Sequence, residues 1–211
     1  MARIDDYKEA VELGTRALKG KDPERLALQS GAGLERAAHE KMILTLDFLN
    51  RKVAVSWPDL EFSSAGDDEE ITIQQRILLL HYLNGSQGSR TTGDWIAYQE
   101  VPDGRFYLDA FQKRAKGPML RAFGEQPQLL PRLAAALYSA TPFQHGDFSV
   151  ALNALPLVPV ALILWEGDDE FPPEGNILFD RSISSIFSAE DIAWLAGMII
   201  YPLVGMAKQG P

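Results

Sequence analysis

The densest group of side chains that could do chemistry follows an uncharged segment, residues 157–164, which is typical of a buried strand. After it comes Trp165, then a short loop and a second apolar segment, which together carry six acids: Glu174 and the five candidates Glu166, Asp168, Asp169, Glu170 and Asp180. Carboxylate oxygens are the ligands that Mg²⁺ and Ca²⁺ prefer, and paired carboxylates also perform acid/base catalysis. The five acids are therefore candidate ligand-binding residues.

The spacing of these acids does not match a known cation-binding loop. Gly167 precedes the main acidic run and Pro172-Pro173 follows it, whereas a calcium-binding loop has its glycine after the third acidic position and a distal glutamate. The pattern favours a solvated turn whose acids cap backbone amides. A site for a ligand or a partner protein stays open as the alternative.

A glycine-rich segment, residues 84–95, is the second candidate site. It reads NGSQGSRTTGDW, and its backbone amides, hydroxyls and the Arg90 guanidinium could surround an anion. However, the segment follows a predicted helix, whereas phosphate-binding loops precede one, and it lacks the Gly-Lys-Ser/Thr signature. A flexible connection is the favoured interpretation, with Arg90 as the residue that would bind if the loop has a ligand.

Other catalytic and metal-binding signatures are missing from the sequence. His39, His81 and His145 do not have the spacing of a helical metal site, and there is no Gly-x-Ser-x-Gly elbow. The chain contains no cysteine, which excludes disulfides, thiolate zinc sites and iron–sulfur clusters held by this chain alone. We therefore predict no metal site, assign no catalytic residue or cofactor, and leave open whether the protein is an enzyme.

Composition narrows the class of protein further. Among 211 residues, 29 acids against 20 Lys and Arg give a formal net charge of −9, which argues against binding to nucleic-acid phosphates. The first residues lack the apolar core of a signal peptide. The apolar segments 149–165 and 192–207 are interrupted by prolines, so we interpret them as buried core elements rather than membrane spans. A cytoplasmic location follows as the expectation.

The order of predicted elements indicates an α+β fold with a mixed or antiparallel sheet packed with several helices, in a single domain over residues 1–211. Helices are expected over residues 4–18, from Asp22-Pro23 to Gly31 or Gly33, over 73–83 with a stop at Asn84-Gly85, over 128–138, and from Ser188 to near the C-terminus. Strands are expected in a hairpin near residues 41–57 with its turn at 49–52, and near 95–101, 148–155, 157–165 and 177–179.

Two segments carry a resemblance to a known family. They are WEGDDEFPPEGNILFD followed by SAEDIAWLAG, and LLLHYLNGSQGSRTTGDWIAYQEVPDGRFY. The chain resembles domain-of-unknown-function family 3786, whose members resemble stand-alone proteins or extensions of iron–sulfur-cluster domains in anaerobes. The resemblance implies a context of anaerobic redox or corrinoid metabolism, without an activity or catalytic residues. This chain departs from the iron–sulfur proteins because it has no cysteine.

Two hypotheses follow from the sequence. The first is a cytoplasmic, non-catalytic module that binds a small ligand or an iron–sulfur or corrinoid partner protein. Its expected contact residues are Arg90, the two aromatic anchors Trp95 and Trp165, and the five acids. The second hypothesis is a divalent-metal-dependent enzyme that uses the carboxylates of residues 166–170. A composite binding site requires that the acidic loop and the Arg90 loop border one pocket.

Overall fold

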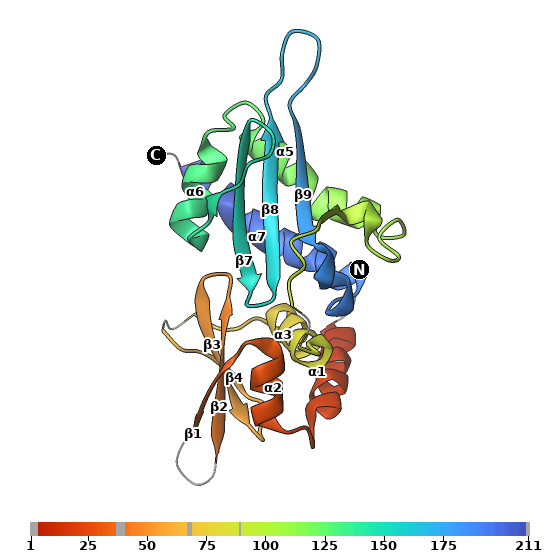
Figure 1. Cartoon of the computed structure of the whole chain (residues 1–211), viewed down its shortest axis with the longest axis vertical. Helices are drawn as coiled ribbons and strands as arrows, with labels where there is room; N and C mark the ends of the chain where they lie inside the picture. Colours follow the sequence, from red (N-terminus) through yellow and green to blue (C-terminus); the bar gives the residue numbers. More distant parts are fainter. Residues whose placement is uncertain (1–3, 37–40, 67–68, 89, 210–211) are drawn as a thin grey trace. The chain divides into compact units, whose positions relative to one another are not determined.

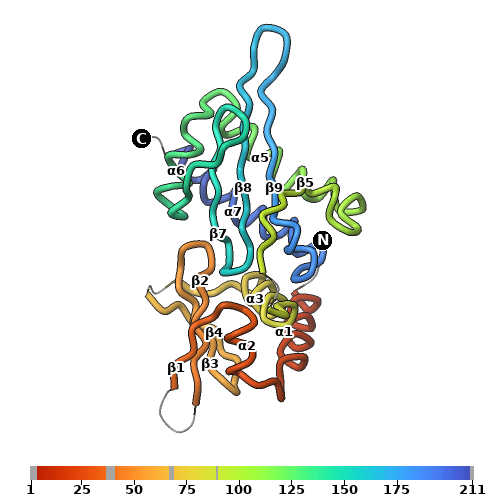
Figure 2. Tube along the Cα trace, in the orientation of Figure 1, coloured from red at the N-terminus to blue at the C-terminus, as the bar shows by residue number. Residues whose placement is uncertain are grey.

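The computed structural model describes residues 4–36, 41–66, 69–88 and 90–209, which form two compact units. The first unit contains the chain up to Arg90 together with Leu155–Leu157 and Ser185–Phe187, and the second contains the rest. Figure 2 traces the path of the chain through them. The single domain expected over residues 1–211 stays a prediction. His39 lies outside the described residues.

The first unit contains a four-stranded antiparallel sheet in the order β1-β2-β3-β4. Its strands are β1 (Gly33–Arg36), β2 (Met42–Phe48), β3 (Arg51–Trp57) and β4 (Phe62–Ser64). Alternate residues of β2 and β3 are buried, so one face of this hairpin joins the core. Leu49 and Asn50 form its turn with φ values of 51° and 64°, the left-handed conformation that matches the twist of two-residue hairpins. The predicted hairpin is confirmed, whereas β1 and β4 were not predicted.

Three helices complete the first unit: α1 (Ile4–Leu18), α2 (Pro23–Ser30) and α3 (Ile73–Gly85). The Asp22 carboxylate accepts a hydrogen bond from the Glu24 amide, and Gly31 ends α2 with a φ of 71°. Thr72 and Gln75 form a capping box at the start of α3, which satisfies two amides that lack helical partners. The predicted start and end of α2 are confirmed, whereas the capping box at Thr72 was not predicted.

The second unit contains a five-stranded sheet in the order β5-β9-β8-β7-β6. Its strands are β5 (Trp95–Ala97), β6 (Thr141–Pro142), β7 (Phe148–Leu155), β8 (Val158–Trp165) and β9 (Glu174–Asp180). The predicted strands near 148–155 and 157–165 are confirmed, and β9 is longer than expected. With two antiparallel sheets and flanking helices, the fold class is α+β, as predicted.

The strand expected over residues 95–101 is wrong beyond Ala97, because Tyr98–Glu100 form a 3₁₀ turn. The Glu100 carboxylate accepts a hydrogen bond from the Ala97 amide at 2.8 Å, which closes the turn. The buried Tyr98 ring stacks on Phe111 with a centroid distance of 4.2 Å, and its hydroxyl donates to the Ala189 carbonyl. Tertiary packing of one tyrosine thus overrides the extended preference of the local sequence.

Helices cover one face of the five-stranded sheet (Figure 1). They are α4 (Leu108–Phe111), which continues through a π-helical turn (Gln112–Lys116) into α5 (Gly117–Phe123), and then α6 (Leu129–Tyr138) and α7 (Ala189–Gln209). A Cβ at Gly175 would lie 2.9 Å from the Leu164 side chain and 3.0 Å from Met119 of α5. Leu164 therefore points to the helices, and its neighbour Trp165 points to the opposite face.

Helix α7 begins with the predicted capping interaction: the Ser188 hydroxyl accepts from the Asp191 amide, and the Asp191 carboxylate accepts from the Ser188 amide. The helix has 21 residues, longer than the apolar segment suggested, and by length and composition it could cross a membrane. Half of its most apolar window is buried inside the protein. A core helix passes the same test, so length and composition alone do not make α7 a membrane span.

The end of α3 yields a testable prediction, because Gly85 is needed for space rather than as the helix stop that the sequence suggested. It is still helical, and a Cβ there would lie 2.1 Å from the Ile186 carbonyl oxygen within the same unit. Gly85→Ala should lower the free energy of unfolding by about 3 kcal/mol, measured by urea denaturation. Gly205→Ala, in α7 where nothing lies within 4 Å, is the control and should raise stability by about 0.5–1 kcal/mol. Equal effects of the two changes would contradict the argument.

Candidate functional site

The acidic loop joins β8 to β9 and extends beyond the neighbouring strands (Figure 1). Asp168 organises it: its carboxylate accepts hydrogen bonds from the Glu170 and Phe171 amides, both at 2.8 Å, and its amide donates to the Phe171 carbonyl. These backbone hydrogen bonds lower the pKa of Asp168, since they favour the charged form. Asp168 therefore builds a turn, which is the first of the two interpretations drawn from the sequence.

The other acids of the loop are exposed. The amide of Glu166 donates to the Asp147 carboxylate at 2.9 Å, so the Glu166 side chain is not what anchors the start of the loop. Asp169 and Glu170 are exposed, and the neighbouring Phe171 is 67% exposed. Within the described part of the chain, no three His, Asp or Glu side chains are grouped so that they could hold a metal ion. The geometry thus offers negative charge and one exposed ring, without a chelating cluster.

Asp180 does not return to the acidic loop, contrary to the expectation that it lies near it. In the antiparallel register of β8 and β9, Trp165 is opposite Glu174, whereas Asp180 lies six residues further along β9. At about 3.3 Å per residue, the two ends of β9 are roughly 20 Å apart. Asp180 is instead opposite Trp95 of β5.

The Asp180 carboxylate holds the chain that enters β5. Although only 1% exposed, it accepts hydrogen bonds from the Thr92 amide and hydroxyl, the Gly93 amide, and the amide and hydroxyl of Ser182. Burial, the largest single influence, raises the pKa of Asp180, but the hydrogen bonds from Ser182, Thr92 and Gly93 together outweigh it and lower the pKa to about 2. A buried ionised carboxylate surrounded by donors holds together the segments that carry those donors. We call this arrangement the Asp180 clasp.

Arg90 belongs to the first unit, and the acidic loop belongs to the second. A shared pocket for the two loops therefore stays a prediction. Thr92 and Gly93, which the sequence offered as possible anion ligands, already donate to Asp180. The donors of this part of the glycine-rich segment are therefore already used by a carboxylate of the protein itself.

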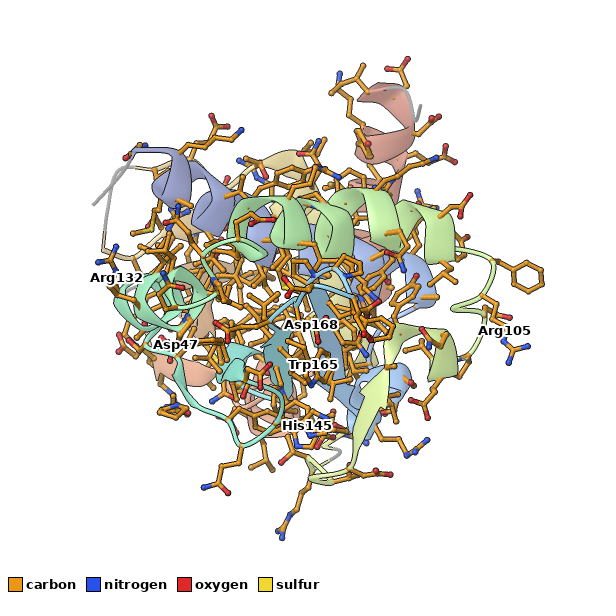
Figure 3. The ribbon with its side chains drawn as sticks, turned by 90° about the horizontal axis from the view of Figure 1, so that it is seen from above. Asp47, Arg105, Arg132, His145, Trp165 and Asp168 are labelled. Carbon is orange, nitrogen blue, oxygen red and sulfur yellow. The ribbon has the colours of Figure 1, made fainter. Side chains whose placement is uncertain are left out.

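Four aromatic side chains form a row on the face of the sheet away from the helices: Trp95, Phe143, His145 and Trp165. The ring centroids lie 4.9 Å apart for Trp95 and Phe143, 6.4 Å for Phe143 and His145, and 6.0 Å for His145 and Trp165. Figure 3, seen from above, places His145 and Trp165 on the side of the sheet opposite the helices. His145 is exposed and the other three rings are half-buried.

The two tryptophans that the sequence singled out thus share one surface. The residues that connect them, Phe143 and His145, were missed, because they lie in a loop without periodicity. Gly146 is the local signal: its φ is +66°, and a Cβ there would lie 2.9 Å from the Leu164 carbonyl oxygen and 3.3 Å from the Trp165 ring. Only glycine lets the loop pass so close over β8. We call these four rings, together with the acidic loop 166–173, the hairpin face.

Fold and surface together define an α+β protein with two antiparallel sheets, one of which carries an aromatic row beside an acidic loop. The chain belongs to the family described as Domain of unknown function (DUF3786), whose model matches residues 22–201. The match spans most of the chain and agrees with the resemblance seen in the sequence. Neither the curated proteins nor the solved structures with which we compared the chain gave a match.

The Asp180 clasp predicts a pH-dependent stability. Because the pKa of Asp180 in the folded protein, about 2, lies below the ordinary value of 3.8, the ionised group stabilises the fold above about pH 4, and this contribution is lost as the pH falls towards 2. Asp180→Asn should lower the free energy of unfolding by about 2 kcal/mol at pH 7. The difference from wild type should shrink at pH 3, as measured by urea denaturation at both values. Asp169→Asn, an exposed position, is the control, and equal losses for both variants at pH 7 would refute the assignment.

Proposed function

We propose that the protein is a non-catalytic binding module that recognises a partner protein through the hairpin face. The observation that carries this proposal is the row of four rings from Trp95 to Trp165, in which each ring contacts the next along one face of the sheet. Tryptophan and other large aromatic side chains supply most of the energy at protein interfaces because they bury much apolar area with few rotatable bonds. An extended row of this kind suits a protein surface better than a small molecule.

The charge of the hairpin face favours a partner with a basic surface. Glu166, Asp169 and Glu170 are exposed, and Glu174 and Asp147 beside them are exposed too. The ammonium of Lys116 lies 3.9 Å from the Glu174 carboxylate and offsets part of this charge. Exposed acids around an aromatic centre attract a cationic partner over several ångströms and accelerate its association.

An iron–sulfur or corrinoid protein is the first partner to test. The support is the family context drawn from the sequence, together with the absence of cysteine from this chain, which means that a cluster would have to be carried by another protein. We propose a reducing, cytoplasmic setting for the interaction, which agrees with the cysteine-free composition. No observation among the described residues favours the divalent-metal enzyme over this proposal, since the loop acids are exposed and unclustered.

Photo-crosslinking tests which surface meets the partner. Benzoylphenylalanine would replace Phe171, which is 67% exposed on the hairpin face, and separately Phe106, which is 85% exposed and elsewhere in the same unit. In anaerobic extracts, we expect a defined crosslinked protein from position 171 and none from position 106. A product from position 106 alone, or none from either, would overturn the proposal.

Substitutions then measure how much the hairpin face contributes. Trp165→Ala should weaken binding of the crosslinked partner by about 30-fold or more, as expected for a central tryptophan, measured by titration calorimetry. The double change Asp169→Lys and Glu170→Lys should slow association and reduce its dependence on salt. Tyr201→Ala is the matched control, because Tyr201 is 57% exposed on α7, on the helix side of the sheet. If Tyr201→Ala weakens binding as much as Trp165→Ala, the hairpin face is not the binding surface.

A further inference from the structure

The first unit contains a pocket that Arg90, the two tryptophans and the five acids do not line, although it includes the start of the glycine-rich segment. Its volume is about 360 Å³, within the range of small-ligand sites. One wall is the face of α2 that presents Leu26 together with Arg25 and Gln29, which are one helical turn apart. Gly20 and Lys21, just before α2, extend this wall. The opposite wall is the end of α3 and the residues after it: Leu83, Asn84, Ser86 and Gln87. Leu26 and Leu83 are buried and contribute the apolar part of the lining.

The polar rim of this pocket is cationic in a chain whose net charge is −9. Neither Lys21 nor Arg25 has a carboxylate partner among the described residues; the Lys21 ammonium instead donates to the Asn84 side-chain oxygen at 3.0 Å. The single acid of the lining, Asp22, is engaged in capping the Glu24 amide. Glu24 itself pairs with Arg36. Two cations against one acid give the lining a net positive charge, which suits an anion.

The hydroxyl of Ser86 is a further unused group in this pocket. Ser86 is 2% exposed, and within the described chain its oxygen has no hydrogen bond of acceptable geometry. Burial raises the pKa of the nearby Tyr82 hydroxyl, and the Leu157 amide and the Ser86 hydroxyl oppose that rise. Tyr82, however, already donates to the Ser30 carbonyl and accepts from the Leu157 amide. A buried hydroxyl without a bond of its own costs stability unless something else engages it.

Polar groups at the end of α3 already make hydrogen bonds within the protein. The Asn84 side-chain amide donates to the Leu80 carbonyl at 2.9 Å, and the Ser86 backbone amide donates to the Tyr82 carbonyl. The Tyr82 carbonyl, one of the four that a helix end leaves unpaired, is thereby satisfied. The donor side chains that remain available to a ligand are the guanidinium of Arg25, the ammonium of Lys21, the hydroxyl of Ser86 and the amide group of Gln29, whereas the Gln87 amide already donates to the Asn84 carbonyl at 3.5 Å.

We propose that this pocket between α2 and the end of α3 binds a small molecule through its phosphate or carboxylate group. Arg25 and Lys21 neutralise the oxyanion, Ser86 donates to it from the floor, and Leu26 and Leu83 contact the apolar part of the molecule. This inference does not depend on the proposed function, because the pocket lies within the first unit and shares no residue with the hairpin face. Loss of either one leaves the other intact.

The inference can be tested by NMR. The full chain is titrated at constant ionic strength with inorganic phosphate, and separately with acetate, while its amide chemical shifts are recorded. We expect saturable shifts centred on Leu26, Ser86 and Gln87, and the tighter of the two probes identifies the oxyanion. Arg25→Gln should weaken the binding of that probe by about tenfold or more, since hydrogen bonds to charged groups are strong. Arg16→Gln is the matched control, an exposed arginine of α1 outside the lining, and should leave affinity unchanged.

Ser86→Ala separates a ligand contact from a structural role. We expect a severalfold loss of affinity for the probe with a melting temperature equal to or above that of the wild type, because the change removes a buried hydroxyl that lacks its own bond. A fall in melting temperature with unchanged affinity would show a structural hydroxyl and overturn the role of Ser86. The whole inference fails if neither probe gives saturable shifts at the pocket, or if Arg16→Gln weakens binding as much as Arg25→Gln.

Discussion

The antiparallel pairing of β8 with β9 decides where every candidate residue of the second unit lies. The register places Trp165 opposite Glu174 and Val160 opposite Phe179, and because side chains alternate between faces, it sends Leu164 to the helices and Trp165 to the open side. A slip of one residue would exchange the two sets. Val160, Leu162 and Leu164 are fully buried on the helix side, and Ile163 is fully buried beneath Gly146 on the other side, so a slip would misplace buried side chains on both faces.

The same pairing places the acids at opposite ends of β9, in two groups that differ in burial and in hydrogen bonding. Asp180, at one end of β9, is enclosed by backbone amides and hydroxyls, so it serves the fold and has a depressed pKa. The acids of the loop at the other end are exposed, and of these Asp168 caps the turn. The features of this unit that the fold does not account for are the surface charge and the aromatic row beside it, and the proposed function rests on them.

Much of the fold could be predicted because its signals are local. Asp22 before Pro23, Thr72 before Gln75, and Ser188 before Asp191 mark helix starts through short-range hydrogen bonds. The hairpin of β2 and β3 follows from alternating apolar residues around a turn. The strand at Trp95 was overextended because Tyr98 packs on Phe111 and bonds to Ala189, which is 91 residues away along the chain.

From the sequence alone came the α+β class, the absence of any cysteine chemistry, and the acidic loop as a capped turn. These depend on composition and on contacts within a few residues. Tertiary structure alone decided that Asp180 lies far from the loop, that Phe143 and His145 join Trp95 to Trp165, and that Lys21 and Arg25 face Ser86 across a pocket. Each of those facts joins residues far apart in the chain, and sheet register and helix packing, which bring them together, are set by the burial of the whole core rather than by any local pattern.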